Sequence, residues 1–384
     1  MADLLIYGTE LGDLTEALAT GGTVSAQSTY VRSGSWATRV NPAAGATGYV
    51  QFGERIANGA QNTFVYTTLY TRCYIYLLAL PSANQEECIS IYHTGAAVSL
   101  RLTSTGTLQL YDTALAAVAG AVTSALALNR WYRVELLSTV GAAGAYEIKL
   151  DGVSVASGTC NHGLFDFESV VFGIRTNRNA VTYDAVFDDC AVSTTEYPGA
   201  GAVIYLPPTA NGSTMNFSTG DYTGVDDVPP ADDDSTYIED ATSGHVALFT
   251  VANPTTRGMP NTTCPINCVM SVGRIKEPIA VVSSAALRLR SLTTNDDTTN
   301  RNYTTSYVVA GKLYSTDPST SAAWTYNRLA AAEVGLANNA STLIRCTMTG
   351  VMLDFQAQKE PGAACTIEPG AHLHRLWVHW HADD

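Results

Sequence analysis

The sequence has few charges and very few lysines. Only 15% of its residues are charged, against about 25% in an average globular protein, and only four are lysines: Lys149, Lys276, Lys312 and Lys359. The 21 basic residues stand against 35 acidic ones, which gives a net charge of −14. A protein that binds nucleic acid or an anionic membrane needs clustered Lys and Arg, and none are clustered here. The charge pattern therefore excludes nucleic acid and anionic membranes as partners.

Long apolar runs are also missing. No stretch of about 18 apolar residues occurs, so we expect no membrane insertion. The first residues, Met1 to Leu5, lack the charged start and apolar core of a secretory signal. Hydrophobic residues nevertheless make up 46% of the chain. This amount, with the length, predicts a folded protein of two or three domains.

Motifs of common enzymes do not occur either. The sequence contains no nucleophile elbow, phosphate loop, HExxH zinc helix or dinucleotide fingerprint. We therefore predict no catalytic, cofactor-binding or metal-ligating residue, and a protein that is not an enzyme.

The eight cysteines leave three interpretations open. Cys73 and Cys88 lie in apolar, strand-like runs, which suits buried free thiols. Cys264 and Cys268 form a CxxxC pair, but no second ligand pair at zinc spacing follows it. We expect mainly reduced structural thiols, with disulfides as the first alternative and a metal site as the second.

A β pattern extends along the whole chain. Short runs of Val, Thr, Tyr and Ile are bounded by Gly, Asn, Ser and Asp, which is typical of strands and turns. In the run 87–93, alternation places Cys88, Ser90 and Tyr92 on one face. Asp151-Gly152 predicts a tight hairpin turn. Strands spaced about every 8–12 residues indicate an all-β fold class, with two jelly-roll-like β-sandwich domains and one short helix in the second.

The domain boundary is predicted at the Pro/Gly-rich stretch Thr194–Ala202. We expect a first sandwich over 1–195, a linker over 196–203 and a second sandwich over 204–384. The second sandwich is expected to contain a short helix near 324–334 and a C-terminal strand.

The string RWYRVELLSTVGAAGAYEIKLDGVSVASG, residues 130–158, resembles the laminin-G/concanavalin-like jelly-roll superfamily. A Trp-containing strand, a charged alternating strand and an Asp-Gly hairpin carry the resemblance. It implies a jelly roll over Met1–Val192, with Trp131 between the two sheets. Members of the superfamily bind sugars, bind proteins or cleave glucans, so the resemblance does not assign a function.

Carboxylates were considered as sites because enzymatic members of this superfamily use a Glu-x-Asp-x-Glu strand for glycoside hydrolysis. Asp166 and Glu168 come nearest to it and would share a face of a strand, but the third carboxylate is missing. We expect turn or solvated carboxylates there. For Asp184, Asp188 and Asp189, one interpretation is a calcium site, as in some members of the superfamily. We favour the other, that they are solvated residues at the edge of a sheet.

Two strings in the second half, residues 225–244 (VDDVPPADDDSTYIEDATSG) and 313–338 (LYSTDPSTSAAWTYNRLAAAEVGLAN), resemble structural proteins of tailed bacteriophages. The residues that match in the second string are Asp317, Pro318, Trp324, Thr325, Glu333 and Gly335. The resemblance covers about 202–355 and brings no catalytic residues. Trp324 is expected to plug an open sandwich edge, and the run Asp232–Asp234 to be a solvated loop, with a cation site as the alternative.

Four of the seven histidines lie in the last thirteen residues: His372, His374, His379 and His381. On a strand each HxH pair points to one side and forms a ready chelate. One interpretation is a metal at a trimer axis. We favour the other, an amphipathic final strand that packs against the sandwich or a neighbouring subunit.

These observations predict a non-enzymatic bacteriophage virion structural protein: a tail, fibre-associated or capsid-surface component. Its expected location is the virion, after assembly in the host cytoplasm. Its expected partners are other virion proteins and copies of itself, with a host-surface glycan as a further contact. The alternative is a carbohydrate-binding adhesin, which needs aromatic platforms that the 20 tyrosines can supply. A glycan hydrolase is the third hypothesis.

Overall fold

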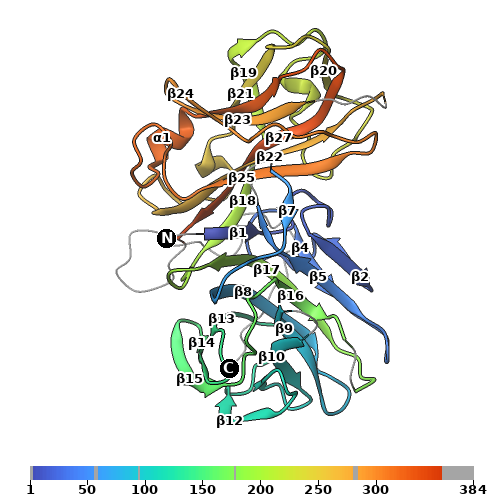
Figure 1. Ribbon diagram of the computed structural model, residues 1–384, viewed down its shortest axis with the longest axis vertical. Helices are drawn as coiled ribbons and strands as arrows, with labels where there is room; N and C mark the ends of the chain where they lie inside the picture. The colour runs from blue at the N-terminus through green and yellow to red at the C-terminus, as the bar shows by residue number, and fades with distance from the viewer. Residues whose placement is uncertain (1–2, 56–58, 94–95, 177–178, 280–283, 357–384) are drawn as a thin grey trace, which may run out of the picture.

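The computed structural model describes residues 3–55, 59–93, 96–176, 179–279 and 284–356. Within these ranges nearly all regular structure is β, and the only α-helix has five residues. No helix in the described ranges is long and apolar enough to cross a membrane. The chain forms two pairs of antiparallel sheets, one built by the first half and one by the second (Figure 1). The predicted all-β class, with two β-sandwiches and one short helix in the second, is confirmed.

The first half consists of an eight-stranded and a seven-stranded sheet. In spatial order the eight-stranded sheet contains β15 (Val153–Cys160), β14 (Gly144–Leu150), β13 (Trp131–Thr139), β8 (Thr68–Ala79), β17 (Asp184–Ser193), β4 (Ala37–Val40) and β3 (Val24–Gln27), with β1 (Asp3–Tyr7) paired to β17. The seven-stranded sheet contains β12 (Ala117–Val122), β11 (Leu108–Tyr111), β10 (Ala96–Thr103), β9 (Gln85–His93), β16 (Ser169–Ile174), β5 (Gly48–Phe52) and β2 (Ala19–Gly22). A short hairpin of β6 (Glu54–Arg55) and β7 (Gln61–Asn62) follows β5.

The apolar core of the first half fills the space between these two sheets. Tyr132, not Trp131, belongs to this core: Trp131 is half-buried and its ring centre lies 5.2 Å from that of Tyr76 on the outer side of the eight-stranded sheet. The expectation for Trp131 is therefore wrong by one residue, which on a strand means the opposite face.

The predicted hairpin at Asp151-Gly152 joins β14 to β15. Both residues have positive φ angles, +52° and +86°, as a type I′ turn requires. A Cβ on Gly152 would lie 2.2 Å from Nη2 of Arg133, the movable end of a long side chain, so it is the positive φ that favours glycine here.

The second half consists of two five-stranded sheets. The first contains β18 (Ala202–Leu206), β27 (Ile344–Phe355), β22 (Ile266–Lys276) and β25 (Val308–Tyr314), with β20 (Ile238–Asp240) paired to β27. The second contains β19 (Pro208–Met215), β21 (Val246–Val251), β26 (Glu333–Asn338), β23 (Ala285–Ser291) and β24 (Thr294–Asp297). Two 3-10 turns, η1 (Tyr222–Gly224) and η2 (Pro254–Thr256), lie between strands.

The helix α1 (Tyr326–Ala330) is shorter than the expected span of 324–334, because Glu333 already begins β26. Thr325 caps α1 by accepting a hydrogen bond from the Arg328 amide. Trp324 is 4% exposed and belongs to the core of the second sandwich, where its Nε1 donates to the Tyr314 carbonyl at 3.1 Å.

The two halves are joined by residues 194–201, between β17 and β18. They pack through an apolar cluster in which Ile6, Leu11 and Ala191 of the first half meet residues of β18, β22, β25 and β27. Figure 1 shows β1 and β17 next to β18 at this junction. The second half therefore contacts the first half on the side of the eight-stranded sheet.

Candidate functional site

One face of the seven-stranded sheet is turned away from the core and carries polar and aromatic side chains. The strand register aligns five residues across β5, β16, β9, β10 and β11, in the order Gln51, Val171, Ser90, Ser99 and Tyr111. Side chains alternate along a strand, so these five share one face. Their neighbours in sequence enter the core cluster of the first half.

The same alternation adds Tyr49, Tyr92, Arg101 and Ser169 to this face, together with Arg175 just after β16. We call these ten residues the polar face: Tyr49, Gln51, Ser90, Tyr92, Ser99, Arg101, Tyr111, Ser169, Val171 and Arg175. Within it Tyr49, Gln51, Tyr111 and Arg175 are half-buried, and the others are buried. Their partial exposure makes the four half-buried residues the ones that a ligand reaches first.

Tyrosine 92 anchors the aromatic part of the polar face. It packs with Val171 and Tyr49 in an apolar cluster that is separate from the main core. Its hydroxyl donates to Oε2 of Glu87 at 3.1 Å. Burial raises the pKa of Tyr92, and the Glu87 carboxylate raises it further. The hydroxyl therefore stays protonated at neutral pH.

Both arginines of the polar face stack on tyrosine rings. The Arg101 guanidinium lies 3.9 Å from the centre of the Tyr111 ring, and that of Arg175 lies 4.4 Å from the centre of the Tyr92 ring. Nε of Arg101 also donates to Oγ of Ser99 at 3.3 Å. Stacking occupies the flat surface of a guanidinium and leaves its N–H edges for oxygen acceptors. The polar face thus combines aromatic rings with directed hydrogen-bond donors.

A pair of buried histidines lies next to Tyr92. His93 ends β9, and His162 lies in the loop 161–168, whose Glu168 amide donates to the Tyr92 carbonyl at 2.7 Å. Burial lowers the pKa of His93 and lowers that of His162 to about 4. Both rings are therefore neutral at pH 7. The same loop exposes Leu164 and Phe165 to solvent.

The carboxylates proposed from the sequence for hydrolysis do not lie on a strand. Asp166 is exposed and Glu168 is half-buried in the segment before β16, while Phe167 between them is buried and bridges to Tyr66. The buried Phe167 between them means that Asp166 and Glu168 lie on the opposite side of the segment from Phe167, at the surface and outside the named strands, as expected of turn or solvated carboxylates.

The carboxylates considered as calcium ligands have protein partners. Asp184 accepts a hydrogen bond from Nε of Arg39 at 2.9 Å. Asp188 and Asp189 are fully buried where the two halves meet. Asp189 pairs with Arg32 and accepts from the Val203 amide at 2.6 Å. The expectation of solvated edge residues is wrong for Asp188 and Asp189, because β17 is an inner strand and the second half covers it.

The acidic run Asp232–Asp234 is also paired rather than simply solvated. Asp233 binds Arg274, which also contacts Asp13 of the first half at 3.1 Å, and Asp234 binds Lys276 at 2.5 Å. These pairs dock the loop onto β22, while Asp232 accepts a hydrogen bond from the Thr236 amide at 3.0 Å.

The cysteines of the described residues fall into two groups. Cys73, Cys88, Cys160, Cys190, Cys268 and Cys346 are free thiols, whereas Cys264 is disulfide-bonded. The CxxxC pair therefore does not act as a pair of metal ligands. The histidines His372, His374, His379 and His381, and the expected C-terminal strand, lie outside the described residues.

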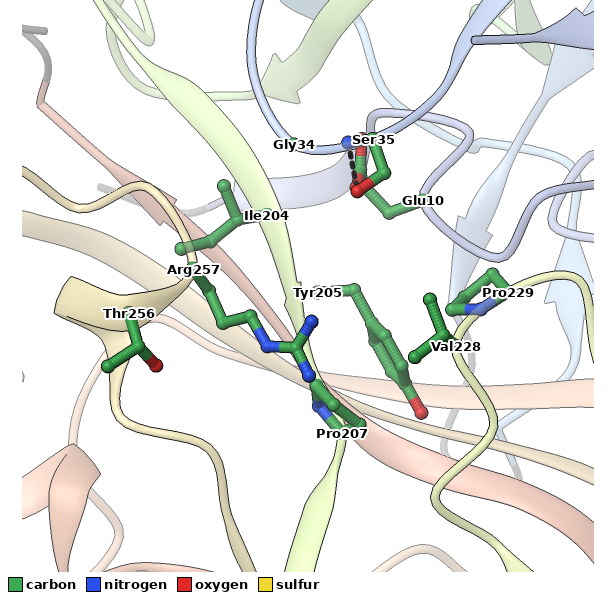
Figure 2. Close-up of a pocket in the computed structure, with 10 residues that line it drawn as sticks. All are labelled: Glu10, Gly34, Ser35, Ile204, Tyr205, Pro207, Val228, Pro229, Thr256 and Arg257. Atoms are coloured by element: carbon green, nitrogen blue, oxygen red, sulfur yellow. Dashed lines mark hydrogen bonds between the residues drawn. The ribbon is translucent and has the colours of Figure 1, made fainter. Parts of the chain in front are cut away.

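A small pocket lies between the two halves (Figure 2). Its charged lining residues are Glu10 from the first half and Arg257 from the second. The Glu10 carboxylate accepts the Ser35 amide at 2.9 Å, and burial, with the nearby Asp188, raises its pKa. Glu10 thus fixes the backbone of the first half at the junction. Sequence reasoning found neither this pocket nor the polar face, although alternation had already placed Ser90 and Tyr92 together.

Comparison with known proteins gives structural likeness only. No family model matches the chain, and no curated protein does. Similar solved structures include a cellulose-induced protein (19% identity, 51% of this chain, 99% of that chain, TM-score 0.40). They also include an endo-β-1,4-glucuronan lyase from Trichoderma reesei (14% identity, 50% of this chain, 95% of that chain, TM-score 0.35). A third is domain 4 of an extracellular arabinanase from Geobacillus stearothermophilus, in complex with arabinotriose (13% identity, 50% of this chain, 92% of that chain, TM-score 0.34).

These comparisons correct one prediction. The sequence led us to expect a protein that is not an enzyme, but the similar structures include polysaccharide lyases and sialidases. The exclusion of catalysis is therefore withdrawn. Identities below 20% and TM-scores at or below 0.40 assign no reaction to this chain. By their names, two of these structures concern glycans: the glucuronan lyase and the arabinanase domain in complex with arabinotriose.

Proposed function

We propose that this chain binds carbohydrate through the polar face of its seven-stranded sheet. The observation that carries the proposal is the gathering of Tyr49, Tyr92 and Tyr111 with Arg101 and Arg175 on one face. A sugar ring has apolar C–H surfaces that pack on aromatic rings, and hydroxyls that accept hydrogen bonds from arginine and amide groups. The half-buried amide of Gln51, which donates to Oγ of Ser169 at 3.0 Å, adds a polar group of that kind.

The test compares two tyrosine-to-alanine variants. Tyr111→Ala removes a half-buried ring of the polar face, and Tyr30→Ala removes a half-buried ring from the first half that stacks on Tyr76, with ring centres 5.5 Å apart. Binding is measured on a broad glycan array and then by titration calorimetry on the best ligand. We expect Tyr111→Ala to weaken binding about tenfold, which corresponds to about 1.4 kcal/mol, and Tyr30→Ala to leave it unchanged.

Absence of binding to every glycan, or equal losses in the two variants, would contradict the proposal. Because catalysis is no longer excluded, the same mixtures are assayed for new reducing ends and unsaturated products. Melting temperatures of both variants show whether either one has simply lost its fold.

We also propose, as a second candidate function, that the chain is a component of a bacteriophage virion that assembles with copies of itself and other virion proteins. The structure of the residues that resemble phage structural proteins, in the string 313–338, is the observation behind this proposal. Asp317 is fully buried and accepts the Ser319 amide at 2.9 Å, and Trp324 closes the core of the second sandwich. The residues that carry the resemblance to phage structural proteins thus form a hydrogen-bonded turn and a buried cap. A virion location and glycan binding are compatible.

Mass spectrometry of purified particles tests the virion proposal. We expect peptides of this chain at a fixed ratio to the major structural proteins, and a homo-oligomer of the isolated chain in analytical ultracentrifugation. A monomer that is missing from the particles would contradict it.

A further inference from the structure

Arg175 differs from most arginines of this chain in its partner. Elsewhere an arginine typically faces a carboxylate, as in the pairs Arg39–Asp184 and Arg288–Asp297. Arg175 stacks on Tyr92 and, within the described residues, makes no ion pair. It is half-buried at the edge of the polar face, so its donors are in reach of a ligand.

This arrangement is well suited to an external carboxylate. A guanidinium held flat on an aromatic ring keeps its N–H edge donors in a fixed plane. A carboxylate matches that edge with two parallel hydrogen bonds, which a neutral hydroxyl cannot make. Arg101, stacked on Tyr111 in the same face, adds a second positive charge.

Bulk electrostatics work against such a ligand. The chain carries a net charge of −14, so an anionic glycan is repelled at long range. A preference for acidic sugars would therefore come from the local arginines and not from the overall charge. Arg32 and Arg130 of the first half also stack on tyrosines, but each of them pairs with an aspartate as well.

We propose that the polar face selects glycans that carry a carboxylate, with Arg175 as the residue that receives it. This inference rests on the proposed carbohydrate-binding function and specifies its ligand class. The shared chemistry is a sugar carboxylate, which a uronic acid or a sialic acid can supply.

Two matched ligand pairs test the proposal by titration calorimetry. One pair is an oligogalacturonate and its methyl ester, and the other is sialyllactose and lactose. We expect the acidic member of at least one pair to bind at least tenfold more tightly than its neutral partner. The pair that shows the difference identifies the uronate or the sialate as the source of the carboxylate.

Arginine variants assign the preference to a residue. Arg175→Gln is expected to abolish it, whereas Arg175→Lys keeps a positive charge and retains part of it. Arg130→Gln is the matched control, because Arg130 also stacks on a tyrosine, 4.8 Å from the centre of the Tyr132 ring, but is 64% exposed on the other sheet. We expect this control to keep the full preference.

The outcomes separate the two proposals. Equal binding of acidic and neutral glycans, or a preference that survives Arg175→Gln, overturns the carboxylate inference while carbohydrate binding stands. A protein that binds no glycan overturns both.

Discussion

Nη2 of Arg72 donates to both carboxylate oxygens of Asp354 at 3.1 Å, although the two residues are 282 positions apart. The side chains are 0% and 2% exposed. Arg72 lies on β8 of the first half and Asp354 on β27 of the second. Nε of Arg72 also donates to the Asp189 carbonyl at 2.9 Å. This ion pair therefore fixes how the two sandwiches meet.

Breaking this pair from one side should strongly destabilise the protein. Within the described residues, Arg72→Met leaves the buried Asp354 carboxylate with one side-chain hydrogen bond, the 3.2 Å bond from Nδ2 of Asn267. We expect a loss of about 3–5 kcal/mol in the free energy of unfolding, measured by urea denaturation. The double variant Arg72→Met/Asp354→Leu removes both charges and should recover a large part of this loss. If the double variant is as unstable as the single one, the stranded charge is not the cause.

The two tryptophans that the sequence singled out should differ in their contribution to stability. Trp324 is 4% exposed in the second core, whereas Trp131 is half-buried outside the first core. Trp324→Ala is expected to cost about 3–5 kcal/mol through the cavity it leaves, and Trp131→Ala about 1 kcal/mol or less. Thermal unfolding of both variants measures the difference. Equal losses would show that the placement of Trp131 outside the core is wrong.

Stability should fall in mild acid because of the buried histidines. Burial lowers the pKa of His162 from 6.5 to about 4, so the unfolded chain takes up a proton before the folded one does. The stabilisation is present above pH 6.5 and is lost as the pH falls toward 4, by up to about 3 kcal/mol.

Denaturation of the wild type and His162→Gln at pH 7, 5.5 and 4 measures this effect. The variant should lose less stability on acidification than the wild type. The comparison between the two proteins cancels contributions from buried carboxyls such as Glu10, whose raised pKa has the opposite effect on stability. Identical pH slopes would exclude His162 as the titrating group.

Any glycan activity should be independent of the carboxylates that the sequence suggested for hydrolysis. Asp166 is exposed and Glu168 is half-buried before β16, on either side of the buried Phe167. We expect Asp166→Asn and Glu168→Gln to retain glycan binding, and any cleavage, within about twofold of the wild type. A loss of cleavage with binding intact would restore them as catalytic candidates.

The sequence predicted what depends on local patterning. Alternation of side chains predicted strands, and Asp151-Gly152 predicted the hairpin turn, because each of these features depends on a few adjacent residues. The same alternation put Ser90 and Tyr92 on one face correctly. It failed for Cys88, which lies in the core, because the pairing of β9 with β10 shifts register there: Leu100 pairs with Ile89 and Arg101 with Glu87.

Features that depend on distant partners escaped prediction. The sequence pattern predicted that Asp188 and Asp189 are carboxylates at a sheet edge. Their partners are the amides of Arg32 and Val203, which are too distant in sequence for a local pattern to indicate. The polar face joins residues from 49 to 175 on five strands, and only the sheet order brings them together. Tyrosine-stacked arginines have no spacing signature, so no motif search finds them.

The two sheets of the first half have different surroundings. The second half covers the outer side of the eight-stranded sheet through Arg72 and Asp354, while the polar face belongs to the other sheet and points away from the core in the opposite sense. The contact with the second half and the polar face therefore belong to different sheets of the first half.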